Sequence, residues 1–119
     1  MPTERLEDCE GLVVLCTCPD VMVAEKLAQT IVEQHLAACV NLLPSVTSIY
    51  HWQGAIERAT ECLLLIKTER AVYPALESAL AELHPYQVPE IVALPIVQGL
   101  PPYLRWMAES VGPASANVP

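Results

Sequence analysis

Two cysteines separated by one residue are the first candidates for chemistry in this sequence. Cys16 and Cys18 end the short apolar run LVVLCTC, which is typical of a buried strand. Alternate residues of a strand point to the same face, so we expect both thiols on one side of it. Soft thiolate ligands favour copper(I), zinc or mercury. The alternative is that both side chains are simply small hydrophobic residues of a core.

Aromatic side chains and one lysine form a second set of candidates. The sequence has four tyrosines, two tryptophans and no phenylalanine. Aromatic residues around a lysine suit a small anionic or amide ligand in a cleft. The alternative is that they anchor contacts between subunits, where Trp and Tyr are enriched. The residues assigned to this set of candidate ligand contacts are Tyr50, Trp52, Lys67, Tyr86 and Trp106.

Lys67 stands out within that set because it lies near the end of the apolar segment CLLLIK. A lysine charge in such a place needs a partner or water. We expect it either to pair with Glu90 or to face a ligand. The other cysteines and histidines have simpler interpretations. Cys39 and Cys62 are expected to be buried core thiols, whereas His35 and His51 are expected to be solvated.

The composition favours an oligomer and excludes two kinds of partner. Hydrophobic residues make up 53% of the 119 residues and charged residues 17%, against about 25% charged in an average soluble domain. We expect a permanent subunit interface to cover the surplus apolar surface, and a rich core is the alternative. The net charge of −8 would repel nucleic acid. No apolar run approaches the roughly 20 residues of a membrane-spanning helix.

The cysteine content and the acidic start of the chain predict a reducing compartment. Residues 1–11 contain four carboxylates and one arginine, whereas a signal peptide begins with basic residues and continues into an apolar segment. Five cysteines without an export signal are expected to remain reduced thiols. We therefore expect a cytoplasmic protein.

Hydrophobic spacing and turn residues predict one domain over residues 11–111, with a flexible lead at 1–10 and a flexible tail at 112–119. The expected strands cover 11–18, 38–52, 55–68 and 90–98. One expected helix follows Asp20, a second begins near 70–73 and a third covers 101–111. Gln53-Gly54 suits a tight hairpin turn, and Pro74 is tolerated only in the first turn of a helix.

This order of elements is that of a ferredoxin-like βαββαβ sandwich of the α+β class, with an extended hairpin between the second and third strands and a C-terminal helix. Its first and third strands are central, and its second and fourth lie at the edges. Pro44 and Pro95 fall on the second and fourth expected strands, in agreement with this plan, because proline cannot donate to a ladder. The long hairpin would extend beyond the sheet, where strands of another subunit could pair with it.

The same plan brings three distant donors to one end of the sheet. The fourth strand is antiparallel to the first, so its start lies beside the end of the first. Glu90 is therefore expected near Cys16. His84 leads into the fourth strand through a segment with two prolines, which restricts its approach. The alternative for His84 is a favourable interaction with the negative end of the helix before it.

Several segments together resemble the CutA, or divalent-cation tolerance, family. The segments are LVVLCTCPD at 12–20, LAACVNLLP at 36–44, TSIYHWQG at 47–54, LLIKT at 64–68, HPYQVPEIVALP at 84–95 and PYLRW at 102–106. The resemblance implies a homotrimer with sheets that continue between subunits and with clefts between them for metal ions or small molecules. It also implies that Cys16, His84 and Glu90 are divalent-metal contacts, and that the trimer is similar to PII signalling proteins.

We therefore expect a trimeric metal-binding protein that acts in divalent-metal tolerance, with copper or zinc as the ion and no required cofactor. The alternative is a PII-like signalling trimer that binds a metabolite or nucleotide between subunits. We do not expect an enzyme, because the sequence has no clustered glycines and no recognisable catalytic motif.

Overall fold

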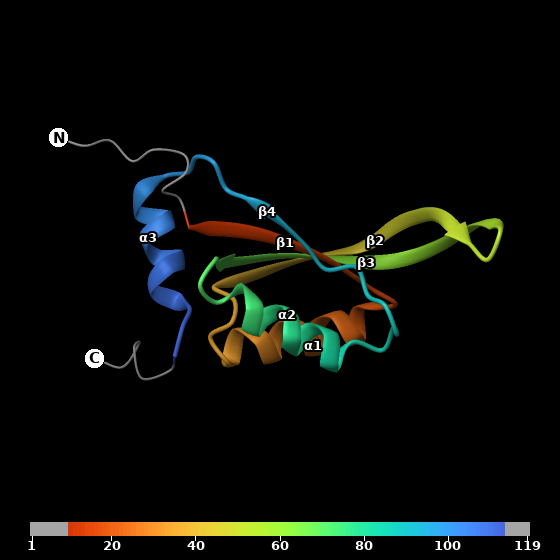
Figure 1. Ribbon diagram of the computed structural model, residues 1–119, viewed down its shortest axis with the longest axis horizontal. Coiled ribbons are helices and arrows are strands. Elements are labelled where there is room, and N and C mark those ends of the chain that lie inside the picture. The colour runs from red at the N-terminus through yellow and green to blue at the C-terminus, as the bar shows by residue number, and fades with distance from the viewer. Residues whose placement is uncertain (1–9, 114–119) are drawn as a thin grey trace.

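A four-stranded antiparallel sheet carries the fold, with the strand order β2-β3-β1-β4. The computed structural model describes residues 10–113. Helices α1 and α2 cover one face of the sheet, and α3 lies across one end (Figure 1). The elements are β1 (Gly11–Cys18), α1 (Val21–Glu33), β2 (Cys39–Trp52), β3 (Ala55–Glu69), α2 (Tyr73–Leu83), β4 (Val92–Pro95) and α3 (Pro101–Ser110). The predicted ferredoxin-like fold is confirmed, including its central and edge strands.

Local signals explain most of the element ends. The Asp20 side chain accepts a hydrogen bond from the Val23 backbone N–H at 2.9 Å, which caps α1. Pro74 lies in the first turn of α2, where its missing N–H has no intrahelical partner to lose. Gln53 and Gly54 both have positive φ, 50° and 83°, as the tight hairpin turn requires.

Strand β4 is shorter than predicted. It covers Val92–Pro95 instead of residues 90–98, and its ladder with β1 runs only from Leu12 to Leu15. Pro89 precedes this stretch and Pro95 is its last residue, and neither can donate a backbone hydrogen bond to β1. One further bond to β1 follows, from the Ile96 N–H to the Gly11 carbonyl oxygen at 3.0 Å. The expected lead and tail fall almost entirely on residues outside the described range.

The two faces of the sheet differ in what covers them. On the helix side, Val14, Leu64 and Ile66 pack with Ile31 and Leu80 in a core that water does not reach. Helices α1 and α2 leave the opposite side of the sheet, which we call the open face, uncovered (Figure 1). The apolar residues on the open face are Val13, Leu15, Leu63, Leu65, Val92 and Leu94.

The β2–β3 hairpin extends far beyond the helices (Figure 1) and makes the molecule 55 Å long but only 22 Å thick. Apolar side chains near its tip are exposed, with Trp52 at 58% and Ile56 at 62%. A single chain therefore leaves both the open face and the hairpin tip in water.

Candidate metal site

Two sulfur atoms and one ring nitrogen, all possible metal ligands, lie close together at the C-terminal end of β1. The Sγ atoms of Cys16 and Cys18 and a ring nitrogen of His84 all lie within 4.8 Å of one another. Both cysteines are free thiols with no solvent exposure, and His84 is 7% exposed. We call these three residues the thiol–imidazole cluster. Cys16 and Cys18 share the helix face because they are two residues apart on a strand.

Two hydrogen bonds hold the imidazole of His84 in place. The Tyr86 backbone N–H donates to Nδ1 at 3.1 Å, so Nδ1 must be an acceptor. Nε2 lies 2.8 Å from the Thr17 carbonyl oxygen and therefore carries the ring proton. The β1–β4 ladder stops at Leu15. Two residues further along β1, the Thr17 carbonyl oxygen accepts its hydrogen bond from His84 Nε2–H instead.

A buried carboxylate lies beside the cluster. Glu61 on β3 is 8% exposed, and its Oε2 accepts a hydrogen bond from the Tyr86 hydroxyl at 2.7 Å. The rings of Tyr86 and His84 are in contact, with centroids 4.7 Å apart. Tyr86 thus ties the segment after α2 to both the imidazole and β3.

The two thiols influence each other's ionisation. Hydrogen bonding to Cys18, followed by burial and then by the charges of Cys18, Glu90 and Glu61, raises the pKa of Cys16 well above its usual range. The hydrogen bond from Cys16 lowers the pKa of Cys18, although burial opposes that effect. The two thiols therefore titrate as a coupled pair.

The predicted metal contacts are only partly brought together. Cys16 and His84 belong to the thiol–imidazole cluster, whereas Glu90 is exposed and lies outside it. Glu90 is nevertheless close enough for its charge to raise the pKa of Cys16. Cys18 completes the cluster, and the shared strand face of Cys16 and Cys18 was the signal for it. Glu61 was not predicted as a site residue. The only indication in the sequence was that this carboxylate directly precedes the apolar run CLLLI.

The predicted ligand contacts fall into three separate places. Tyr50 and Trp52 are exposed on the hairpin, and Tyr86 belongs to the neighbourhood of His84. Lys67 lies at the other end of the sheet, where its Nζ donates to Asn41 Oδ1 at 2.7 Å and sits 5.9 Å from the Tyr103 ring centroid. Trp106 contacts Tyr103, with ring centroids 5.4 Å apart. The expected pairing of Lys67 with Glu90 is not what the structure shows.

Two simpler expectations also need correction. Cys39 is half-buried rather than buried, because it lies on the edge strand β2 opposite Lys67. His35 is half-buried rather than solvated, since its Nδ1 lies 3.4 Å from the Ser110 carbonyl oxygen. The exposure of His51 and the burial of Cys62 are confirmed.

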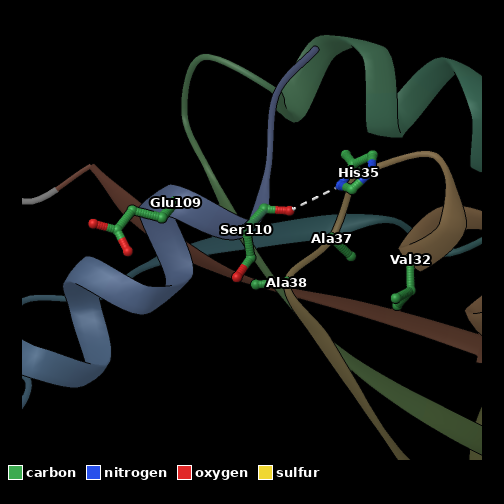
Figure 2. Close-up of a pocket in the computed structure, with 6 residues that line it drawn as sticks. All are labelled: Val32, His35, Ala37, Ala38, Glu109 and Ser110. Atoms are coloured by element: carbon green, nitrogen blue, oxygen red, sulfur yellow. Dashed lines mark hydrogen bonds between the residues drawn. The ribbon is translucent and has the colours of Figure 1, made fainter. Parts of the chain in front are cut away.

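A cavity of about 370 Å³ lies apart from the cluster, between the end of α1, the start of β2 and the end of α3. Figure 2 shows His35 turned toward Ser110, while the Glu109 carboxylate points away from the imidazole. The Gly112 backbone N–H also donates to the His35 carbonyl oxygen at 2.9 Å. These contacts hold α3 against the turn after α1, so the cavity lies between packed elements.

Comparison with known proteins identifies the family. The family model described as CutA1 divalent ion tolerance protein matches residues 12–110. The chain belongs to the CutA family. The divalent-cation tolerance protein CutA of Thermus thermophilus is 51% identical over 100 residues, which are 84% of this chain and 97% of that protein. The protein CutA of mouse is 48% identical over 106 residues, and this CutA-family chain spans 60% of its length.

Solved structures agree with this assignment. The structure of the divalent cation tolerance protein from Thermus thermophilus superimposes with a TM-score of 0.84 at 50% identity, over 86% of this chain and 99% of that one. A periplasmic divalent cation tolerance protein CutA from Archaeoglobus fulgidus gives 0.83 at 34% identity over 86% of this chain and 99% of that one. Within residues 10–113, no helix is both long enough and apolar enough to cross a membrane.

The hydrogen bond between Tyr86 and Glu61 predicts a dependence on alkaline pH. Burial, and then the hydrogen bond to Glu61, raise the pKa of Tyr86 above its usual value of about 10. The stabilisation is therefore complete below about pH 10 and is lost as the pH rises toward the folded-state pKa. We expect the melting temperature of the wild type to fall more steeply above pH 10 than that of Tyr86→Phe. Parallel curves would show that this hydroxyl adds nothing to stability.

Proposed function

We propose that this protein is a cytoplasmic homotrimer that binds copper or another thiophilic metal ion and acts in divalent-metal tolerance. The observation that carries this proposal is the thiol–imidazole cluster, in which two thiols and an imidazole converge at the end of β1. Sulfur and nitrogen donors suit copper and zinc rather than magnesium or calcium. Members of the family that carry the name divalent-cation tolerance protein support the same role. Binding, rather than catalysis, is the activity that we propose.

Glu90 remains part of the proposed site as a carboxylate near its edge. It lies two residues before β4, and its charge acts on Cys16. A movement of the segment between α2 and β4 would bring the carboxylate closer to an ion held in the thiol–imidazole cluster. With few protein ligands and a buried location, we expect moderate rather than very high affinity.

The trimer part of the proposal rests on the exposed apolar surface of the single chain. Val92 and Leu94 on the open face are 49% and 50% exposed, and the tip of the hairpin is apolar as well. Contiguous apolar surface of this kind marks a protein–protein interface. Pairing of the hairpins of neighbouring subunits would cover both regions at once.

Titration with zinc and copper under anaerobic, reducing conditions tests the metal site. We expect Cys16→Ser and His84→Ala to weaken binding at least tenfold, or about 1.4 kcal/mol, and Glu90→Gln to weaken it less. His51→Ala is the matched control, because His51 is exposed on the hairpin and remote from β1. If every substitution changes the affinity by less than about twofold, or roughly 0.4 kcal/mol, the cluster is structural.

A second candidate function is small-anion binding by a PII-like signalling trimer, and the surroundings of Lys67 favour it. This ammonium group lies on the open face beside Asn41 and the Tyr103 ring. Covering that face with other subunits would remove water from the charge, and an anionic ligand would compensate for that loss. A thermal-shift screen of metal ions against nucleotides and metabolites separates the two candidates, because a ligand of the folded state raises the melting temperature.

A further inference from the structure

Sulfur, rather than nitrogen, is the donor that the fold leaves available in the thiol–imidazole cluster. Cys16 and Cys18 are free thiols. His84 uses Nδ1 to accept from the Tyr86 N–H and Nε2–H to donate to the Thr17 carbonyl. An imidazole binds a metal through a nitrogen lone pair, so His84 would have to break its hydrogen bond to Tyr86 or give up its ring proton. The Cys16 thiol makes a long backbone contact, from its Sγ to the Thr17 carbonyl oxygen at 4.0 Å, which leaves the sulfur lone pairs free to bind a metal.

The two carboxylates nearest the cluster are also poorly placed to bind a metal ion there: one already accepts a hydrogen bond, and the other lies outside the cluster. Glu61 accepts the hydrogen bond of the Tyr86 hydroxyl, and Glu90 is exposed and outside the cluster. Zinc in a structural site takes four ligands, and copper(II) prefers a tetragonal set of nitrogen and oxygen donors. The described residues around β1 offer neither set without rearrangement.

Two sulfur atoms at this separation suit an ion of low coordination number. Two bonds of the zinc–sulfur length, about 2.3 Å each, span about 4.6 Å when placed in line. The sulfur atoms of Cys16 and Cys18 lie within 4.8 Å of each other. Soft thiolates select copper(I) among the biological copper states, and a reducing compartment supplies copper in that state.

We propose that Cys16 and Cys18 bind one copper(I) ion between their two sulfur atoms, and that His84 positions this pair without being a ligand. This inference rests on the proposed metal-binding function and specifies the ion and its donors. Each thiol releases its proton to solvent as its sulfur binds, so one Cu⁺ replaces two protons. No electron is transferred, and the bound site carries one net negative charge.

The segment between α2 and β4 lies against the pair. Cys16 and Cys18 have no exposed surface, and His84 and Tyr86 of this segment pack beside them. The hydrogen bond from Tyr86 to Glu61 anchors the segment to β3. Copper would therefore arrive when this segment opens, and His84 would return over the loaded pair.

Competition with a chromogenic copper(I) chelator under anaerobic conditions tests the proposal. We expect one copper(I) ion per chain and at least a 100-fold loss of affinity in Cys18→Ser and in Cys18→Ala. The matched control is Cys62→Ser, because Cys62 is equally buried and pairs with Cys18 in register but lies outside the cluster. Its affinity should stay within about threefold of the wild type. A melting curve for each variant checks that it folds.

Two further readouts separate ligands from neighbours. X-ray absorption at the copper edge should show two sulfur neighbours and no imidazole. Glu61→Gln should tighten copper(I) binding, because it removes a negative charge beside a site that gains one. An imidazole neighbour, or a Cys18 variant with unchanged affinity, would overturn the proposal. If zinc then still binds through Cys16 and His84, the proposed function stands without this inference. If no metal binds, both are wrong.

Discussion

Replacing Leu94 by lysine is expected to convert the proposed trimer into monomers. Leu94 is 50% exposed on the open face of a single chain, where a substitution changes stability by only about 0.5 kcal/mol. In a trimer that covers this face, three lysine charges would lose their hydration, at an effective penalty of several kcal/mol per charge. Sedimentation equilibrium at micromolar concentration should give three times 13.0 kDa for the wild type and 13.0 kDa for the variant.

The matched control for that experiment is Leu83→Lys. Leu83 is 48% exposed at the end of α2, on the opposite side of the sheet from the open face. This variant should remain a trimer. The melting temperature of the wild type should also rise with protein concentration, because dissociation and unfolding are coupled. A wild type that sediments as a monomer, or a Leu94 variant that remains trimeric, would show that the open face is not the interface.

Replacing Leu80 by alanine is expected to lower the free energy of unfolding by about 2–5 kcal/mol. Leu80 has no exposed surface and lies in the core between α2 and the sheet. Removal of its side chain leaves a cavity that the rigid sheet cannot fill. Urea unfolding at one fixed protein concentration measures the effect, and Leu83→Ala, which truncates a half-exposed leucine on the same helix, should lose less than about 1 kcal/mol.

The same substitution links the core to the metal site. The His84 backbone N–H donates to the Leu80 carbonyl oxygen at 2.9 Å, so Leu80 supports the turn from which the imidazole extends. We expect Cys18 to react faster with a thiol reagent in Leu80→Ala than in Leu83→Ala. Equal rates in the two variants would show that the packing of α2 does not control access to the thiols.

The order and type of the elements could be predicted because they depend on local signals. The periodicity of Ala24, Leu27 and Ile31 specifies the buried face of α1, and Gln53-Gly54 specifies the hairpin turn. The order of the elements placed β1 and β3 at the centre of the sheet, and the prolines on the edge strands agreed with that plan. The length of β4 was less predictable, because a strand ends where its backbone stops pairing with its neighbour, here β1.

The candidate site was predicted in location but not in composition. Topology alone placed Cys16 and His84 at one end of the sheet, since an antiparallel neighbour begins where β1 ends. The sequence did not determine the hydrogen bonds of His84, because these join Thr17 and Tyr86 across separate elements. For the same reason, the burial of Glu61 under Tyr86 and the engagement of Lys67 with Asn41 and Tyr103 appear only in the folded chain. Distances between side chains depend on how strands and loops pack in three dimensions, and the spacing of residues along the sequence does not contain that information.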